Sequence, residues 1–375
     1  MRKIVYILSF IYLLMCVNVQ GEQPLSKSKQ RIVGGTEVKR AFWPWMAALV
    51  RRGSKSLSSG HFCGGVLVHR QWILSAAHCV ENMLPHEFDI VLDAHDLNTD
   101  SGDIYPVRKI IIHPEFDTMS LENDLVLIEL KNDAPYTTIQ PMITQDIAPG
   151  ISCVVIGWGR LSENGPFSPK LQEVNVPIVS NEVCQQAFQK DPDHIQISSN
   201  MLCAGEPEGG RDACFGDSGG PLICRSINNW ELAGLVSWGH GCARPDYYGV
   251  YTRISKYIGF IEQNVPSVIL TGHITRFPEK EQPISQALIQ LIDTEYQTFT
   301  DNYGYYSFDV PSGIFRISIQ ASHYLPIEKQ INLFQRRKVV FYNESLIAEV
   351  AGDVNRDGIT DLMDVILTLQ RISDN

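Results

Sequence analysis

Residues 212–220 place a serine in a setting that suits nucleophilic catalysis. The segment reads Asp-Ala-Cys-Phe-Gly-Asp-Ser-Gly-Gly, so Ser218 lies between an aspartate and two glycines. A serine hydroxyl is a poor nucleophile at neutral pH, so it needs a base to take its proton and donors to hold the oxyanion. Glycine permits tight loops, so the N–H groups of Gly216 and Ser218 are predicted to point at one oxygen. Taken alone, the segment also fits a surface turn.

Two other segments supply the partners that such a serine needs. Residues 74–79 read Leu-Ser-Ala-Ala-His-Cys and present His78, and residues 123–128 present Asp124 before an apolar run. The order His78, Asp124, Ser218 is that of the chymotrypsin-type triad. We therefore expect His78 to act as general base toward Ser218 and then as general acid toward the leaving amine. Asp124 is expected to hold the tautomer of His78.

The three motifs agree in order and spacing with one known family. The chain from Ile32 to about Val265 resembles a trypsin-like serine protease of the chymotrypsin family. The resemblance implies two packed six-stranded barrels with the triad in the cleft between them. Short apolar or alternating runs separated by turn residues favour an antiparallel all-β architecture as well. The clearest are 66–68, 107–112, 125–130, 153–156, 174–179 and 232–238, and Ile254, Tyr257, Ile258 and Ile261 predict a closing amphipathic helix.

The resemblance also assigns residues that would bind the substrate. Asp212 matches the family position at the base of the primary specificity pocket, where a carboxylate selects a basic side chain. Ser237, Gly239 and Gly249 match positions around that pocket, and the two glycines leave it open to a long residue. Ala213 replaces a serine often found there, so arginine, with its planar fork, is predicted to be preferred over lysine. A surface ion pair of Asp212 is the alternative interpretation.

The first 21 residues are typical of a secretory signal. Arg2 and Lys3 precede an apolar run from Ile4 to Val17, which is shorter than the roughly 18 to 20 residues of a membrane-spanning helix. A secreted or periplasmic protein that does not span a membrane is therefore predicted, with an uncleaved anchor as the alternative.

Residues 22–31 are polar and resemble an activation peptide. They end at Arg31, ahead of Ile32-Val-Gly-Gly. Cleavage after Arg31 would free the amine of Ile32 to pair with Asp217, and a buried carboxylate needs such a partner. The chain is therefore predicted to be a zymogen, with an ordinary flexible N-terminus as the alternative.

The cysteines indicate an oxidising compartment. Of nine cysteines, Cys16 lies in the leader, which leaves an even number for a disulfide framework. The sequence alone cannot pair them, and zinc binding competes, although no Cys-x-x-Cys spacing occurs. The resemblance implies the pairs Cys63 with Cys79, Cys153 with Cys224, Cys184 with Cys203, and Cys214 with Cys242.

Length and composition bound the class of protein. With 375 residues, of which 44% are hydrophobic and 19% charged, the chain is globular and long enough for more than one domain. Its net charge of -11 argues against a nucleic-acid partner and against anionic membrane surfaces. No cofactor is expected for catalysis, and the expected partners are proteins or peptides with exposed arginine or lysine.

Beyond residue 265 the sequence changes character. The runs 268–275, 287–292, 298–301, 304–310 and 313–320 alternate apolar and polar residues, which predicts a small β-sandwich. This part resembles the regulatory-like β-sandwich modules found beside secreted enzymes. It carries no catalytic constellation, so a spacer or adhesion role with a cell-surface or extracellular partner is expected.

The final segment has the spacing of an EF-hand loop. Oxygen ligands fall at loop positions one, three, five, seven, nine and twelve, and Gly358 supplies the turn at position six. The predicted calcium ligands are Asp353, Asn355, Asp357, Ile359, Asp361 and Asp364. The segment resembles half of a dockerin, because a dockerin carries two such loops and one is present here. An acidic solvated tail is the alternative.

The predicted fold is therefore all-β: a two-barrel chymotrypsin-like protease domain, a small β-sandwich and a short EF-hand-like loop-helix. The predicted divisions are 1–21, 22–31, 32–265, 266–349 and 350–375. The predicted function is a secreted serine endopeptidase that cleaves after arginine, and less well after lysine, through an acyl-enzyme. The alternative is a non-catalytic adhesion or binding protein that uses the protease fold as a scaffold.

Overall fold

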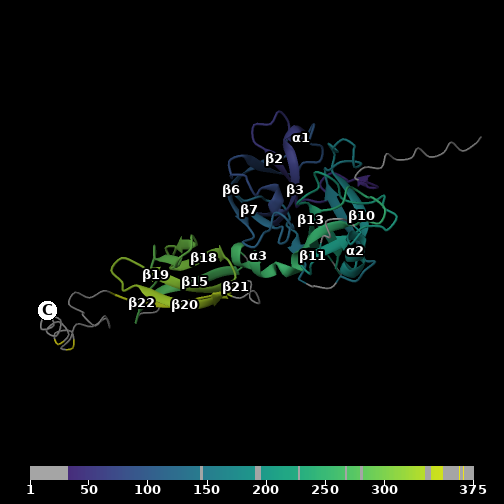
Figure 1. The fold of residues 1–375 in the computed structure, drawn as a ribbon. Helices are drawn as coiled ribbons and strands as arrows, with labels where there is room; N and C mark the ends of the chain where they lie inside the picture. The colour runs from purple at the N-terminus through teal and green to yellow at the C-terminus, as the bar shows by residue number, and fades with distance from the viewer. Residues whose placement is uncertain are drawn as a thin grey trace, which may run out of the picture.

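A computed structural model describes residues 33–143, 147–190, 196–226, 229–266, 268–278, 282–333 and 339–348, with Met363 and Ile366. The described residues form two β-barrels followed by a separate C-terminal β region (Figure 1). Within these ranges, no helix is both long enough and apolar enough to cross a membrane.

The first barrel is closed by six strands in the order β2-β3-β4-β7-β6-β5. Their apolar residues fill the barrel, and β7, which reads Val-Leu-Ile-Glu-Leu, is buried along its whole length. A strand buried on both faces shows a continuous apolar run rather than an alternation. The strands are β2 (Met46–Arg51), β3 (His61–His69), β4 (Trp72–Ser75), β5 (Phe88–Leu92), β6 (Asp103–Ile112) and β7 (Val126–Leu130).

The second barrel closes through the pairing of β9 with β10. β10 shows the regular alternation of buried and more exposed residues that a half-buried strand requires. The strands are β9 (Ser152–Gly157), β10 (Gln172–Val179), β11 (Met201–Ala204), β12 (Pro221–Arg225), β13 (Trp230–Trp238) and β14 (Gly249–Arg253). Two short strands attach to this barrel, β1 (Thr36–Glu37) to β10 and β8 (Gln140–Pro141) to β13.

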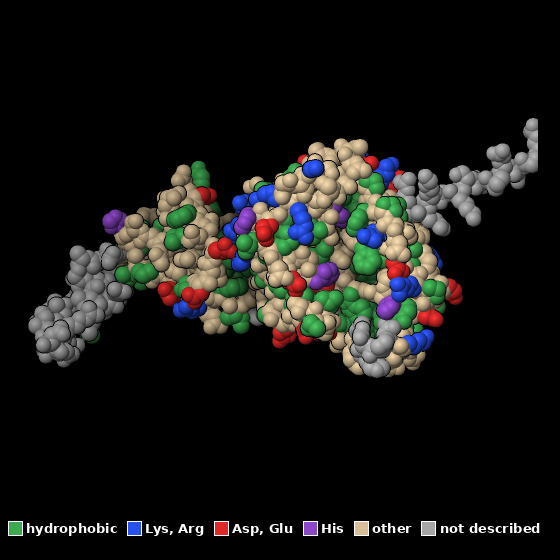
Figure 2. Space-filling view, turned by 45° about the horizontal axis from the view of Figure 1, so that its top comes forward, with side chains coloured by type: hydrophobic (Ala, Val, Ile, Leu, Met, Phe, Trp, Pro, Cys, Tyr) green, Lys and Arg blue, Asp and Glu red, His purple; other side chains and the backbone are tan. Residues whose placement is uncertain are grey.

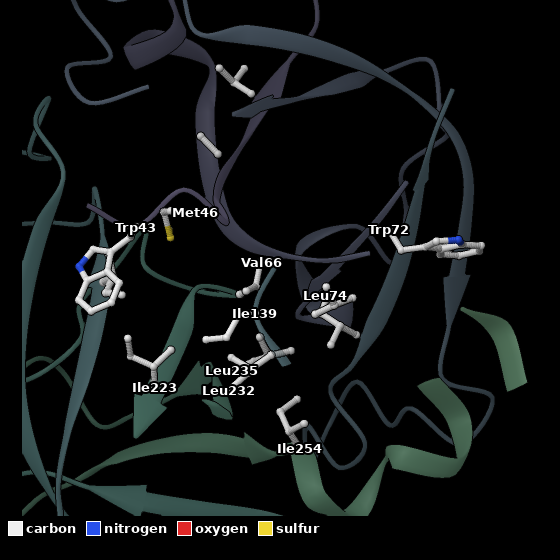
Figure 3. Close-up of a cluster of buried hydrophobic side chains, with 14 of the residues drawn as sticks. Trp43, Met46, Val66, Trp72, Leu74, Ile139, Ile223, Leu232, Leu235 and Ile254 are labelled. Carbon is white, nitrogen blue, oxygen red and sulfur yellow. The ribbon is translucent and has the colours of Figure 1, made fainter. Parts of the chain in front are cut away.

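The two barrels share a hydrophobic cluster. Figure 3 shows Val66 and Leu74 of the first barrel close to Leu232 and Leu235 of the second. All four side chains are fully buried. Burial of apolar surface on both sides of this junction stabilises the relative placement of the barrels, and so of the residues each contributes to the cleft.

Short helices complete the two-barrel unit, residues 33–265. They are α1 (Leu57–Gly60), η1 (Ala77–Cys79), α2 (Asn181–Phe188), η2 (Ile254–Lys256) and α3 (Ile258–Asn264). Ser180 begins α2, and its hydroxyl oxygen accepts a hydrogen bond from the N–H of Val183 at 3.3 Å. The expected closing helix is found as η2 followed by α3, and Ile254 and Ile261 are buried in the cluster that the two barrels share.

Each strand predicted between residues 32 and 265 lies within or overlaps an observed strand, so the all-β, two-barrel expectation is confirmed.

Among the described residues, four disulfides join Cys63 to Cys79, Cys153 to Cys224, Cys184 to Cys203 and Cys214 to Cys242, the pairs that the resemblance implies. On the surface, Figure 2 shows acidic and basic side chains interspersed over the viewed face of the two-barrel unit.

The C-terminal β region consists of two sheets that enclose one apolar cluster. The first sheet contains β15 (Val268–Phe277), β18 (Tyr305–Val310), β21 (Val339–Phe341) and β22 (Glu344–Ile347). The second contains β16 (Leu288–Leu291), β17 (Gln297–Phe299), β19 (Gly313–Gln320) and β20 (Ile327–Leu333). The alternating runs of the sequence correspond to β15 through β19.

Polar contacts connect this region to α3 and the first barrel. The N–H of Ser312 donates to the carbonyl of Glu262 at 3.1 Å, and Arg108 Nη2 lies 3.0 Å from Glu295 Oε2. Arg70 forms a further ion pair with Asp309. The C-terminal β region is therefore attached to β6, to the turn between β3 and β4, and to α3, which lies next to it in Figure 1.

Candidate active site

The predicted catalytic base, His78, lies on η1, directly after β4. Its Nδ1 is 2.7 Å from Asp124 Oδ2, and its backbone N–H donates to Asp124 Oδ1 at 3.0 Å. One carboxylate therefore fixes both the ring and the backbone of His78. This leaves Nε2 as the ring nitrogen that faces the cleft, the arrangement a general base toward serine requires.

Asp124 lies at the entrance to β7 and is almost completely buried, with 1% of its surface exposed. Its Oδ2 also accepts a hydrogen bond from the hydroxyl of Ser237 on β13. Its backbone carbonyl accepts one from the hydroxyl of Thr252 on β14 at 2.7 Å. A buried carboxylate without such donors would be costly. The second barrel therefore supplies two of the groups that hold this residue of the first barrel.

The environment of His78 favours its charged form. Burial lowers the pKa of His78, but the hydrogen bond and the negative charge of Asp124 outweigh burial, so the net pKa is raised above the ordinary 6.5. A base of higher pKa accepts the proton of a serine more readily. The same carboxylate stabilises the imidazolium that then forms.

Ser218 lies in the loop that precedes β12 of the second barrel. Its carbonyl accepts a hydrogen bond from the N–H of Gly64 on β3 at 2.8 Å, so a strand of the first barrel holds the predicted nucleophile of the second. Gly219, which follows, has a φ of 74°, and a Cβ there would lie 2.2 Å from the Oγ of Ser75. The motif therefore needs glycine at this position for both conformation and space.

The predicted oxyanion donors are available. Gly216 has a φ of 94°, the left-handed conformation that glycine adopts readily. Among the described residues, neither the N–H of Gly216 nor that of Ser218 donates to a protein acceptor. Ser218 and His78 line one cavity of about 300 Å³, in which a substrate carbonyl can lie near these groups.

Asp217 is buried and directly precedes the predicted nucleophile, Ser218. Its Oδ1 accepts from the N–H of Gly159 at 2.8 Å, and its Oδ2 accepts from the N–H of Cys214 at 2.9 Å. Burial raises the pKa of Asp217 to about 7, although the two N–H groups lower it. The carboxylate therefore has hydrogen bonds, but no cation lies beside it among the described residues.

Asp212 lines the same cavity and is itself buried. Its Oδ2 accepts from the N–H of Ala243 at 3.0 Å, whereas its buried Oδ1 has no hydrogen-bond partner among the described residues. Burial raises the pKa of Asp212 to about 7. An unpaired buried carboxylate oxygen is expensive unless a ligand satisfies it.

The other predicted pocket residues line this cavity as well, namely Ala213, Ser237, Gly239 and Gly249. A Cβ on Gly249 would lie 2.7 Å from Asp212 Oδ1, so glycine there keeps the carboxylate accessible. The disulfide Cys214–Cys242 joins the two segments that form the pocket.

Two glycines that make the Asp217 site possible were not predicted from the sequence. A Cβ on Gly157 or Gly159 would lie 2.1 Å or 2.3 Å from a carboxylate oxygen of Asp217. The Gly-Trp-Gly pattern around Trp158 was the available signal. The hydrogen bond from Ser237 to Asp124 was also missed, because Ser237 was assigned only to substrate binding.

Two predicted sites cannot be placed. Arg31 and Ile32 lie outside the described residues, as do all six predicted calcium ligands between Asp353 and Asp364. Within the described residues, Cys63, His78 and Cys79 cluster closely enough to suggest a metal site, but the two cysteines are joined in a disulfide and are not free ligands.

Comparison with known proteins agrees with this geometry. The family profile described as Trypsin matches residues 32–261. The chain is 38% identical over 267 residues to "Trypsin II-P29" of Gallus gallus, which covers 69% of this chain and 99% of that protein.

Two longer proteins match as well. The chain is 37% identical over 254 residues to "Serine proteinase stubble" of Drosophila melanogaster, covering 65% of this chain and 32% of that protein. It is 39% identical over 241 residues to "Transmembrane protease serine 9" of Rattus norvegicus, covering 63% of this chain and 22% of that protein. The chain therefore spans a third or less of the length of these two relatives. The profile match over more than half of the chain and the near-complete coverage of a trypsin show that the chain belongs to the trypsin family of serine proteases.

Proposed function

We propose that this chain is a secreted serine endopeptidase, made as a zymogen, that hydrolyses peptide bonds after arginine and less well after lysine. The observation that carries the specificity is Asp212, which lines a cavity shared with Ser218 and whose buried Oδ1 has no partner among the described residues. A guanidinium or ammonium group entering this cavity would pair with that oxygen and favour the ionised carboxylate.

The chemistry follows from the groups beside the cavity. His78 takes the proton of Ser218 as its oxygen attacks the carbonyl carbon, and the N–H groups of Gly216 and Ser218 hold the resulting oxyanion. His78 then gives the proton to the leaving amine, which leaves an acyl group on Ser218. A water molecule, deprotonated by His78, releases that group.

The first test uses residues 22–375 cleaved after Arg31. We expect turnover of an arginyl peptide substrate by this protein and none by Ser218→Ala prepared in the same way. Correctly cleaved, folded protein without turnover would instead support the alternative, a binding or adhesion protein with a protease scaffold. The complete set of His78, Asp124 and Ser218 favours the enzyme.

The zymogen proposal is supported by the residues that follow the cleavage site. The carbonyl of Val33 accepts a hydrogen bond from the N–H of Asp212 at 3.2 Å, and a Cβ on Gly34 would meet the carbonyl of Gly210 at 2.3 Å. The chain next to Ile32 therefore lies against the pocket segment, within the protease body that also holds Asp217. An Arg31→Gln protein is expected to remain inactive after treatment with trypsin, and full activity in this variant would exclude the zymogen.

The preference for arginine over lysine rests on Ala213, which is buried beside Asp212 and carries no hydroxyl. Arginine can pair with the carboxylate through two nitrogens, whereas an ammonium group gains more from an additional acceptor. We expect Ala213→Ser to raise the kcat/KM of a lysyl peptide relative to its arginyl counterpart. An unchanged ratio would remove Ala213 from the explanation.

We propose that the C-terminal segment, residues 350–375, binds calcium, and that the C-terminal part of the chain attaches the enzyme to an extracellular or cell-surface partner. The domain divisions proposed are those predicted from the sequence. Calcium should raise a thermal transition of the full chain relative to the chelator-treated protein, because binding to the folded state stabilises it. The same comparison on Asp353→Ala should show no shift. A calcium-dependent shift that persists in this variant would locate the ion elsewhere.

A further inference from the structure

The two outer faces of the C-terminal β region differ in composition. In the second sheet, outward positions of β19 and β20 carry charged residues such as Arg316 and Glu328, as a solvent-facing surface requires. Outward positions of the first sheet instead carry Ile269, Tyr305 and Phe341, which expose 39%, 56% and 76% of their surface. Because large apolar side chains are normally buried, an exposed group of them on one face marks a recognition surface.

The strand register places these side chains together. β18, β15 and β21 are neighbours in the first sheet (Figure 1). Thr271 of β15 pairs with Ser307 of β18 and with Phe341 of β21, and His273 pairs with Tyr305. Residues that alternate with these, such as Leu270, point into the core. We call this surface the aromatic face; it comprises Ile269, Thr271, His273, Tyr305, Ser307 and Phe341.

The ring of Tyr305 is held in place before any ligand arrives. It stacks on the ring of His273, with centroids 4.3 Å apart and ring planes 17° apart. His273 is fixed in turn, because its Nε2 lies 2.9 Å from the carbonyl oxygen of Tyr303 and its backbone N–H donates to Asn343 Oδ1 at 2.8 Å. A ligand that stacks on this ring therefore pays little to order it.

The aromatic face is uncharged, although the chain has a net charge of -11. None of its six residues carries a carboxylate, an amine or a guanidinium group. The carboxylates next to it are paired, Asp309 with Arg70 and Glu344 with Lys329 at 2.8 Å. A charged partner would find no complementary charge on this face, so its chemistry fits a neutral ligand.

The size of the aromatic face limits the kind of neutral ligand. Three strands and three rows of side chains cover roughly 300 Å², whereas a stable protein interface needs about 800 Å² on each partner. The face is therefore too small to hold a second copy of this chain or another folded protein by itself. An extended peptide is disfavoured as well, because the strand amides are paired within the sheet and the peptide's own amides would lose water without gaining partners.

We propose that the aromatic face binds a neutral, extended polysaccharide of the cellulose or chitin kind, through stacking of sugar rings on Tyr305 and Phe341. The proposal names the class of the extracellular partner proposed above and rests on that attachment role. A sugar ring with equatorial substituents presents C–H groups on its faces and polar groups at its rim, so it covers an aromatic ring while its hydroxyls stay in water. The strands that carry Tyr305 and Phe341 flank β15 and lie about 10 Å apart, a span that two linked sugar rings can cover.

The test measures co-sedimentation of residues 22–375, cleaved after Arg31, with insoluble cellulose and with chitin. We expect the wild type to bind at least one of them, and the soluble hexamer of the same sugar to compete. Tyr305→Ala and Phe341→Ala should each weaken binding by roughly tenfold, whereas Phe341→Trp should retain it because it keeps a ring to stack on. Phe299→Ala is the matched control, since it removes a ring of similar exposure, 54%, from β17 of the second sheet.

A parallel measurement separates this proposal from the endopeptidase function. Turnover of a soluble arginyl peptide reports the protease alone, and all four variants should keep it. Wild type that cleaves this peptide but binds neither polysaccharide refutes the aromatic face as a glycan site, whereas binding without turnover refutes only the endopeptidase. Binding that survives both alanine variants would place the glycan elsewhere and overturn the proposal. A wild-type dimer that Phe341→Ala converts to a monomer in analytical ultracentrifugation would overturn it in favour of a second copy of the chain.

Discussion

The buried carboxylates of the two barrels differ in the partners that surround them. In the first barrel, Asp124 accepts hydrogen bonds from His78 and from Ser237, so its charge is compensated within the molecule. In the second barrel, burial raises the pKa of Asp212 and of Asp217 to about 7, and no cation accompanies either among the described residues. The first barrel carries a carboxylate that is hydrogen-bonded to an imidazole and a hydroxyl, and the second carries two buried acids with no cation beside them among the described residues.

This difference indicates which functions each barrel contributes. The pair in the first barrel is ready to move protons whether or not substrate is present. The acids of the second barrel gain a partner only when a cation arrives, and the proposed cations are the substrate side chain for Asp212 and the amine of Ile32 for Asp217. Specificity and activation are therefore both expected to reside in the second barrel. The following changes test this contrast.

The largest effect is expected from breaking the compensated pair. Asp124→Asn should lower kcat by roughly 10⁴-fold, which is the size already known for this change in chymotrypsin-type triads. Because Asp124 raises the pKa of His78, the wild type should lose kcat/KM as pH falls through a value above 6.5. Without the carboxylate, burial lowers the pKa of His78 and only the weaker effect of the Glu81 charge opposes it, so the acid limb should move to lower pH. A pH–rate profile measures both effects.

The exposed Asp133→Asn, also in the first part of the chain, is the matched control and should leave the profile in place. An unchanged acid limb in Asp124→Asn would show that His78 does not owe its raised pKa to this carboxylate.

Removing the negative charge of Asp212 should slow the cleavage of substrates with a basic side chain and of no other class. Asp212→Asn should reduce kcat/KM for an arginyl peptide by at least roughly 10²-fold, because the guanidinium then enters the cavity without a counter-charge. A matched leucyl peptide should not be cleaved more slowly. Asp246→Asn, on the exposed surface of the second barrel, serves as the control. Equal losses on both peptides would mean that Asp212 has a structural role instead.

The need for a correctly placed Asp217 carboxylate can be tested by changing Gly159, which packs against it. Gly159→Ala places a Cβ 2.3 Å from Asp217 Oδ2, so the carboxylate must move and the oxyanion loop with it. We expect activity to fall more than roughly tenfold and the melting temperature to fall by several degrees. Gly259→Ala in α3 meets nothing within 4 Å and should be neutral or slightly stabilising. Full activity of Gly159→Ala would show that the loop tolerates a displaced Asp217.

The smallest effect is expected from the contact between the barrels. Ser237→Ala removes one hydrogen bond to the ionised Asp124, which corresponds to a loss of roughly tenfold in kcat/KM. Thr252→Val removes a bond to the neutral backbone carbonyl of Asp124 and should cost about threefold or less. Single-turnover kinetics on an arginyl ester would compare the two. The reverse order would contradict the view that Ser237 acts on the charge.

Some strands could not be predicted from the sequence, for physical reasons. β2 reads Met-Ala-Ala-Leu-Val-Arg and is buried on both faces along most of its length, so it has neither alternation nor helical period. β12 follows directly on the nucleophile loop and is similarly buried. By contrast, β10 alternates regularly, and the predicted run 174–179 lies within it.

The sequence by itself determined the residues that can do chemistry, because a triad and a glycine-rich loop are properties of residue type, order and spacing. His78, Asp124 and Ser218 could be named in that way, and Asp212 was predicted through the resemblance to a known family. Only the tertiary structure decided which groups compensate them. Ser237 contacts Asp124 across 113 positions of the chain, and Gly159 contacts Asp217 across 58. Electrostatic balance depends on distances in space, and the folding of two barrels against one another sets those distances.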